Sequence, residues 1–354
     1  MSSGFSRGDR IPDIQRRDQA GEPRMLYDLQ VGQPILLMLF DDSEAADTRT
    51  ALSMLAPDDP DWKQITRVAL VQSTSAQCKN LMNGASSNLT VLVDDGAVTK
   101  HLLGSGTMRP PPITAFALDT NFRVIERIEC DADKSLDDFM RQLKAIYKNK
   151  IPPSPKILEQ QAPVLFIPRV LEVSKCDELI AFFRKEGGQP SGIAHLEDNK
   201  IRWQPDPSVK MRRDVYMQDG VLLESIKAAL TRRLLPEIKR CFNFQVTQHE
   251  VFKLVCYDAQ TGGYFRPHRD NESRDTQHRR FAMTLNLNTG DYSGGQLRFP
   301  EFGPDLYQPE RGGALIFSCS LLHEVIPVTA GERYVLLGFF FGDTERMQVM
   351  QYQK

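Results

Sequence analysis

The chain has 354 residues, a formal net charge of −2 and 25% charged residues. Its length suits two domains that each bury a core, and its nearly balanced charge argues against binding to nucleic acid or another polyanion. The N-terminal segment Met1–Asp9 lacks the apolar core of a secretory signal, and no run approaches the roughly 20 apolar residues of a membrane span. We therefore expect a cytoplasmic protein without nucleic-acid or membrane partners.

The first 150 residues alternate between apolar runs and segments compatible with helices. Continuous apolarity predicts buried strands at Pro34–Phe40, Val68–Val71, Leu89–Val93 and Ile113–Leu118. Helices fit the segments around 44–55 and 75–84, Phe122–Ile128 fits the return strand of a hairpin, and Ser135–Tyr147 is amphipathic. We expect an α/β domain over residues 1–150 whose central sheet is covered on both faces.

This half of the chain resembles the thioredoxin fold, and most closely its peroxiredoxin branch. The resemblance rests on Gly8–Pro12, on the strand that ends at Phe40, and on Arg109–Pro112 ahead of a strand ending near Asp119. It implies that Pro112 takes the place of the family's cis-proline. Where the peroxidatic cysteine should follow the first core strand, however, this chain has Asp41–Thr48.

Peroxide reduction requires an activated thiolate at a helix N-terminus. The six cysteines include no Cys-x-x-Cys pair, which is typical of reduced structural thiols in a protein without a signal sequence. Cys130 ends a predicted strand and Cys78 lies in a helix-like segment, so neither occupies the catalytic position. We expect a redox-inactive domain that serves substrate docking, assembly or stability.

The proline-rich segment at 151–163 predicts a stiff linker to a second domain at 164–354. Ser174 and Asp177 have the spacing of a capping box that opens a helix, and Val221–Phe242 is a second amphipathic stretch. The polar segment 187–218, which contains Trp203, suggests a long loop acting as a lid, a substrate clamp or flexible filler.

Two basic clusters interrupt this second domain. They are Lys210–Arg213 and His278–Arg280, and both are interleaved with acidic residues such as Asp206, Asp214 and Asp275. The interleaving favours a solvated rim over a binding patch. Short strand-like runs separated by Gly, Pro and Asn turns follow, which predicts a mainly-β jelly roll, a double-stranded β-helix buttressed by the two helices. The runs are Val251–Tyr257, Tyr264–Asp270, Phe281–Asn288, Gln296–Phe299, Gly313–Ser318 and Arg333–Phe341.

A possible metal site lies within these strands. His268 and Asp270 are two residues apart, so their side chains point to the same side of an extended strand. With His323 from a distant strand they would form the two-His-one-carboxylate face of non-haem Fe(II) oxygenases. Arg333 begins an apolar strand, where a guanidinium pointing inward needs an anion such as a dicarboxylate. The alternative is an ordinary strand-end arginine that faces water.

The second domain, from about residue 164 to 345, resembles the prolyl 4-hydroxylase-like branch of the Fe(II)/2-oxoglutarate-dependent dioxygenases. The matching stretches are Tyr257…Gly262…Pro267–Asp270, Tyr292–Leu297, Leu322–Val325, Pro327–Val328 and Gly331–Arg333. The resemblance implies that His268, Asp270 and His323 bind Fe(II) and that Arg333 binds the distal carboxylate of 2-oxoglutarate. It also implies that Tyr257, and Asn286 in place of a further tyrosine, contact 2-oxoglutarate.

The activity that this resemblance implies is hydroxylation of a peptidyl or small-molecule substrate. O2 and 2-oxoglutarate are consumed, succinate and CO2 are released, and ascorbate is a further cofactor to consider. Two other classes stay open, a thioredoxin-fold redox protein and a non-catalytic binding protein with an accessory barrel. The missing thiolate argues against the first, and the ordered set of His268, Asp270, His323 and Arg333 argues against the second. A homodimer is one option for the assembly.

Overall fold

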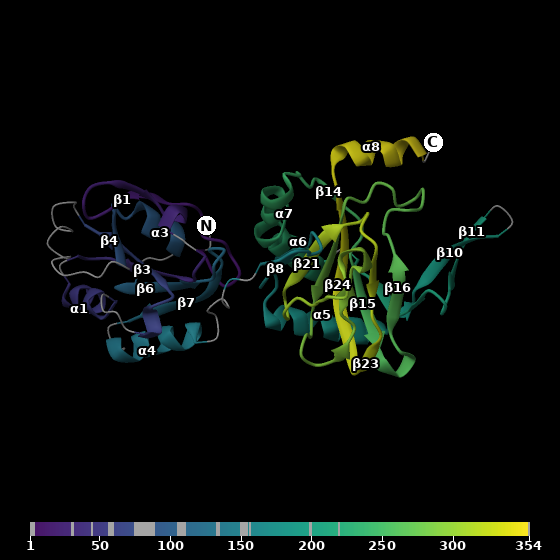
Figure 1. Cartoon of the computed structure of the whole chain (residues 1–354), viewed down its shortest axis with the longest axis horizontal. Coiled ribbons are helices and arrows are strands. Elements are labelled where there is room, and N and C mark those ends of the chain that lie inside the picture. Colours follow the sequence, from purple (N-terminus) through teal and green to yellow (C-terminus); the bar gives the residue numbers. More distant parts are fainter. Residues whose placement is uncertain are drawn as a thin grey trace. The chain divides into compact units, whose positions relative to one another are not determined.

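The structure is a computed structural model that describes residues 4–29, 32–43, 45–55, 60–73, 89–104, 111–131, 135–148, 155, 157–197, 200–218 and 220–352. It divides into two compact units, Met1–Lys156 and Ile157–Lys354 (Figure 1). Among the described residues, no helix combines the length and apolarity that a membrane crossing requires.

A twisted sheet forms the centre of the first unit, with strand order β5-β4-β3-β6-β7. Strands β3, β4 and β5 are parallel to one another. Strand β6 pairs antiparallel with β3, and β7 pairs antiparallel with β6. The strands are β3 (Ile35–Phe40), β4 (Thr66–Gln72), β5 (Leu89–Asp94), β6 (Ile113–Leu118) and β7 (Val124–Cys130). The helices are α1 (Ala46–Leu55), α3 (Ala97–Leu103) and α4 (Leu136–Tyr147), beside a short β1 (Gln15–Arg17) and β2 (Pro23–Met25) ribbon.

Side-chain alternation along β3 divides the core of this unit into two layers. One face packs against α1 and α4, and the opposite face packs against residues of α3 and the N-terminal segment. Because both faces are buried, every residue of β3 is apolar and buried. The expected α/β domain with a sheet covered on both sides is therefore confirmed. The predicted helix at 75–84, which contains Cys78, lies outside the described residues.

The segment after β3 leads into α1 without a thiol. Asp42 accepts a hydrogen bond on its carbonyl from the Thr48 hydroxyl at 2.7 Å, which ties the start of α1 to the strand end. Cys130 is buried in the core at the end of β7, as predicted. Pro112 lies directly before β6, where the resemblance placed the family's cis-proline, but no cis peptide bond occurs among the described residues. The Pro112 carbonyl instead accepts from the Asp41 N–H at 3.2 Å, which extends the β3–β6 pairing.

Two antiparallel sheets form the body of the second unit, beside the two-stranded pairs of β10 (Gly192–Glu197) with β11 (Lys200–Pro205) and of β18 (Ser293–Gly294) with β23 (Val328–Ala330). The larger has the order β8-β21-β17-β24-β15-β13-β9, with β14 also paired to β24, and the smaller has the order β12-β16-β22-β19-β20. The larger sheet contains β8 (Leu165–Ile167), β9 (Gln189–Pro190), β13 (Arg213–Tyr216), β14 (Gln248–His249), β15 (Lys253–Asp258), β17 (Phe281–Asn286), β21 (Ala314–Ser318) and β24 (Glu332–Phe341). The smaller contains β12 (Lys210–Met211), β16 (Tyr264–His268), β19 (Leu297–Arg298), β20 (Leu306–Tyr307) and β22 (His323–Val325).

The two faces of the larger sheet have different partners. Its inner face shares an apolar core with the smaller sheet, and its outer face packs against the helices. These helices are α5 (Val173–Glu186), α6 (Val221–Arg233) and α7 (Leu235–Phe242), and α8 (Asp343–Tyr352) follows β24. Ala162 is already buried in the inner core, so the packed chain begins before Val164. The strand-rich second domain with supporting helices is thus confirmed.

Two predictions about the helices of this unit were wrong. Helix α5 starts after Glu172, so Ser174 lies inside its first turn and caps nothing; the Glu172 carboxylate pairs with Arg233 instead. The stretch Val221–Phe242 is two helices, because Pro236 lies in the first turn of α7 and a proline cannot continue a preceding helix.

The segment at 187–218 is not a loop. Most of it forms strands, including the β10 (Gly192–Glu197) and β11 (Lys200–Pro205) hairpin, which extends away from the two sheets (Figure 1). Backbone pairing satisfies the N–H and C=O groups of this polar segment without requiring apolar side chains. Trp203 belongs to β11.

Candidate metal site

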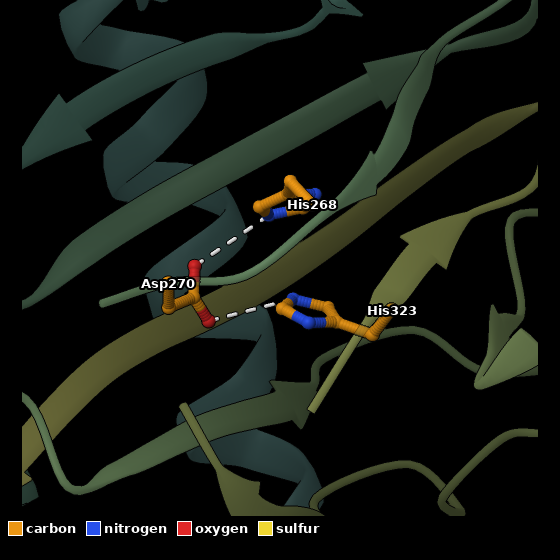
Figure 2. A group of neighbouring side chains, drawn as sticks. All are labelled: His268, Asp270 and His323. Carbon is orange, nitrogen blue, oxygen red and sulfur yellow. Dashed lines mark ion pairs between the residues drawn. The ribbon is translucent and has the colours of Figure 1, made fainter. Parts of the chain in front are cut away.

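Three potential metal ligands come together at the inner face of the smaller sheet (Figure 2). One ligand atom from each of His268, Asp270 and His323 lies within 4.8 Å of the others. The two histidines are register partners on β16 and β22, and the Asp270 N–H donates to the Cys319 carbonyl at 2.9 Å. Pairing of the two strands therefore places the distant His323 opposite the His268–Asp270 segment.

Backbone carbonyls orient both imidazole rings. His268 Nδ1 lies 2.7 Å from the Arg266 carbonyl, and His323 Nδ1 lies 3.0 Å from the Leu321 carbonyl. Because a carbonyl only accepts hydrogen bonds, each Nδ1 carries the proton and each Nε2 has its lone pair free. The Nε2 atoms face the Asp270 carboxylate at 3.5 and 3.4 Å (Figure 2). This donor set is the one expected of a divalent metal site.

Electrostatics keep these groups in the protonation states that metal binding needs. Burial alone would raise the pKa of Asp270, but in the acidic range where this carboxyl titrates the charge of His323 and the hydrogen bond and charge of His268 outweigh burial and lower the pKa to about 2. Burial also lowers the pKa of His323, which favours the neutral ring. The carboxylate is thus ionised and the His323 ring neutral near pH 7.

Arg333 is buried deep in the same cavity and has no anionic partner among the described residues. Only 2% of the residue is exposed. Its Nη2 donates to Thr284 Oγ1 at 3.3 Å and to Asn286 Oδ1 at 3.1 Å, whereas its buried Nε has no hydrogen-bond partner. A buried guanidinium is costly unless an anion pairs with it, so an anion in the cavity would stabilise Arg333.

Tyr257 and Asn286 occupy different places around this arginine. Tyr257 is the register partner of Arg333 on β15, lines the cavity and accepts a hydrogen bond from Arg212 Nη1 at 3.2 Å. Asn286 does not line the cavity. Its amide donates to Tyr292 and to the Pro309 carbonyl and accepts from Arg333, so it holds the guanidinium from behind.

The cavity that contains the triad has a volume of about 390 Å³, within the usual range for a small-molecule site. Residues such as Leu297, Phe317 and Val325 form its apolar floor. Aromatic rings also contact the two histidine side chains. The Phe265 ring stacks on His268 with 3.4 Å between centroids, and Phe317 contacts His323 edge-on at 4.6 Å.

The two basic clusters form only in part the solvated rim that the sequence suggested, because Arg213 and Arg280 are 38% and 53% exposed whereas other members line the cavity. Lys210, Arg212 and Arg279 all line the cavity. The Arg212 side chain is only 8% exposed and pairs with Asp214 at 3.1 Å, and Arg279 pairs with Glu250 at 2.6 Å. The Arg-x-Asp spacing at 212–214, which puts both side chains on one face of an extended strand, was the signal that could have revealed this.

Residues 252–341 match the family model of the 2OG-Fe(II) oxygenase superfamily. This match covers the strands from β15 to β24 and includes the triad and Arg333. The C-terminal unit therefore contains a 2OG-Fe(II) oxygenase domain.

Curated relatives match over about half of this chain. The human multifunctional procollagen lysine hydroxylase and glycosyltransferase LH3 is 28% identical over 193 residues, which are 52% of this chain and 24% of the relative. Procollagen-lysine,2-oxoglutarate 5-dioxygenase 1 of Rattus norvegicus is 28% identical over 195 residues, 52% of this chain and 25% of the relative. The chain thus spans about a quarter of the length of these relatives.

Solved structures resemble each part of the chain. A Pseudomonas putida prolyl-4-hydroxylase has a TM-score of 0.41 and 21% identity, covering 51% of this chain and 93% of its own. The peroxidoxin BcpB of Mycobacterium tuberculosis has a TM-score of 0.35 and 20% identity, covering 40% of this chain and 96% of its own.

Proposed function

We propose that this chain, whose C-terminal unit contains a 2OG-Fe(II) oxygenase domain, is an Fe(II)- and 2-oxoglutarate-dependent dioxygenase that hydroxylates a peptidyl or small-molecule substrate. When bound, Fe(II) with 2-oxoglutarate and O2 supplies the oxidising chemistry, with succinate and CO2 as products. The observation that carries the proposal is the presence in one cavity of three preorganised metal ligands and an unpaired, buried guanidinium.

Each site residue has a distinct role in this proposal. His268, Asp270 and His323 would hold Fe(II) through two Nε2 atoms and one carboxylate, which leaves positions open for co-substrate and O2. Arg333 would pair with the distal carboxylate of 2-oxoglutarate through the Nη1–Nη2 edge of its guanidinium, because Nη1 makes no hydrogen bond among the described residues and the Nη2 bond to Thr284 is long at 3.3 Å.

Tyr257 and Asn286 support this arrangement differently. Tyr257 would form one wall of the co-substrate pocket, because its ring lies 5.3 Å from the Arg333 guanidinium carbon. Asn286 would act as a positioning residue by fixing Nη2, which aims the other guanidinium nitrogens into the cavity. The apolar floor would keep water away from the reacting centre.

The proposal extends to the architecture. We assign the two facing sheets to a double-stranded β-helix, the jelly roll expected for residues 164–354. Residues 1–150 form a thioredoxin-like, redox-inactive domain, a role supported by the burial of Cys130 and by the thiol-free segment before α1. The protein is proposed to act in the cytoplasm, with ascorbate as an auxiliary reductant.

The test is succinate release from 2-oxoglutarate by the full chain, with and without Fe(II). We expect wild-type protein to release succinate only with Fe(II), even without a primary substrate. His323→Ala removes one ligand and should abolish both turnover and stoichiometric Fe(II) binding. His249→Ala is the matched control, because His249 is exposed on β14 and does not line the cavity. Wild-type protein that forms no succinate, or a His323→Ala protein as active as wild type, would contradict the proposal.

A further inference from the structure

Two lysines that belong to neither the triad nor the arginine pocket line the cavity. Lys210 lies on β12 opposite Phe265 of β16, and Lys253 lies on β15 opposite Tyr216 of β13. Both lysines, together with Gly192, also line a second recess of about 480 Å³. They therefore stand at the junction between the metal-site cavity and an adjoining space bounded by polar residues such as Gln189, Ser191 and Gln218.

Apart from Arg333, the other cations of the cavity wall have acidic partners, whereas these two lysines have none among the described residues. Arg212, Arg279 and Arg269 pair with Asp214, Glu250 and Glu301, respectively. Among the residues that the structure describes, no carboxylate lies within 4.0 Å of either lysine ammonium. Each ammonium instead lies over an aromatic ring, Lys210 at 5.3 Å from the Phe265 centroid and Lys253 at 4.9 Å from the Tyr216 centroid.

The acidic groups near Lys210 compensate its charge only in part. Burial first, and then repulsion from Arg212 and Lys253, lower its pKa to about 7 despite the attraction of Asp214 and Asp270. An anion seated between the two lysines would remove this repulsion. A carboxylate has two acceptor oxygens and can take one charge-assisted hydrogen bond from each lysine.

The anion in question is different from the one proposed for Arg333. Lys253, Val255 and Tyr257 alternate onto the same face of β15, so Lys253 and the Tyr257–Arg333 pair are separated by about 13 Å of strand, at roughly 3.3 Å per residue. The Lys253 ammonium leans toward β13, over Tyr216, whereas Arg333 is on β24, the neighbour on the other side. A five-carbon dicarboxylate bound at Arg333 and the metal would therefore not reach Lys253.

We propose that Lys210 and Lys253 bind a carboxylate of the primary substrate and thereby place its reacting carbon at the metal site. This inference rests on the proposed function and adds the chemical class of the substrate, an acidic molecule. The carboxylate belongs either to a free amino acid or to an acidic side chain of a peptide. The polar recess beyond the lysines accommodates the remainder of the molecule.

The experiment measures binding by calorimetry to the full chain loaded with Fe(II) and 2-oxoglutarate under nitrogen, so that no turnover occurs. One probe set contains the free standard amino acids and their carboxamides. The other contains acetylated, amidated dipeptides with Asp or Glu and their Asn or Gln counterparts. We expect at least one acid to bind about tenfold more tightly than its amide, the lower end of what a charge-assisted hydrogen bond contributes. The set in which the preference occurs identifies the source of the carboxylate.

The variants assign that preference to the two lysines. Lys210→Met and Lys253→Met keep most of each stem and delete the charge, so each should remove about tenfold of the acid's affinity. Lys210→Arg keeps the charge and should retain the preference for the acid. Lys239→Met is the matched control, since Lys239 is exposed on α7, and should behave like wild type.

Three results would overturn the proposal. In the first, no acid of either set binds more tightly than its amide; in the second, the preference survives in both methionine variants. In the third, the variants weaken 2-oxoglutarate binding instead, which would assign the lysines to the co-substrate. Failure of the proposed function is seen separately, as a wild-type chain that releases no succinate with Fe(II), and it leaves the anaerobic binding result interpretable.

Discussion

Replacing Arg333 by methionine tests the co-substrate site most directly. The substitution keeps much of the apolar stem and deletes the guanidinium. Nη2 is held by Asn286 and, at 3.3 Å, by Thr284, and Nη1 makes no hydrogen bond among the described residues, so the Nη1–Nη2 edge remains for a carboxylate. Two charge-assisted hydrogen bonds contribute about 1.5–3 kcal/mol each. The variant also loses the cost of burying the guanidinium, so the lower end of the sum, about 3 kcal/mol, is expected.

That energy corresponds to a rise of about 100-fold in the 2-oxoglutarate concentration needed for half-maximal succinate release, at about 1.4 kcal/mol per tenfold. Fe(II) affinity should stay close to wild type, because no triad ligand is changed. Arg333→Lys should be milder, since it keeps the charge and loses the planar fork.

Arg298→Met serves as the matched control, because Arg298 pairs with Glu324 and does not line the cavity. The assay is the dependence of succinate release on 2-oxoglutarate at fixed Fe(II), with metal content measured in parallel. An unchanged 2-oxoglutarate dependence in Arg333→Met would refute the reasoning. Lys253, which lines the cavity, would then be the next residue to test.

Three further outcomes are expected. Asp270→Ala should lose Fe(II) and succinate formation with a cooperative thermal transition retained, as metal analysis and calorimetry would report; retained metal and turnover would exclude the assigned ligand. The full chain should show no thiol-dependent peroxide consumption, and consumption that disappears in Cys78→Ser or Cys130→Ser would restore the redox interpretation. Lys210→Met should raise the Tm of the ligand-free chain by roughly a few degrees at pH 6, because a lysine whose pKa falls to about 7 on folding destabilises the native state most below that pH. The gain should shrink as the pH rises toward 10, and a constant gain across this range would contradict it.

The sequence could indicate the triad because its chemistry is encoded locally. Two ligands separated by one residue share a face of any extended strand, and a lone downstream histidine completes the set. What the sequence did not contain is the pairing of β16 with β22, which sets His268 opposite His323. Their assignment as metal ligands stays a prediction, although the structure places them together.

Charge patterns were less informative than spacing. The interleaved acids around Lys210–Arg213 suggested a solvated rim, yet Arg212 and Asp214 form a buried ion pair beside the cavity. Whether a charged pair faces water or a pocket depends on which strand face is covered, and that is decided by residues far away in the chain. For the same reason Asn286, expected to touch the co-substrate, lies behind Arg333.

The helix boundaries were predicted wrongly, in part for reasons that the sequence itself contains. Pro236 was present in the sequence, and its missing N–H ends the preceding helix. The side chain of Glu172, by contrast, is occupied by Arg233, a residue on another helix, so local capping patterns around Ser174 gave no warning. A local capping pattern does not predict the start of a helix when a residue at that end forms an ion pair with another helix.

The position of β24 has a consequence for biosynthesis. This strand lies between β17 and β15 in the larger sheet and carries Arg333, yet it is the last of the described strands to be translated. Until it leaves the ribosome, the edges of β15 and β17 that will face each other across it have no partner, and unpaired edges are templates for aggregation. A ribosome stalled before Glu332 would thus hold a chain that has all three metal ligands but neither a closed sheet nor the guanidinium. Addition of β24 pairs the edges of β15 and β17 and brings Arg333 into the cavity.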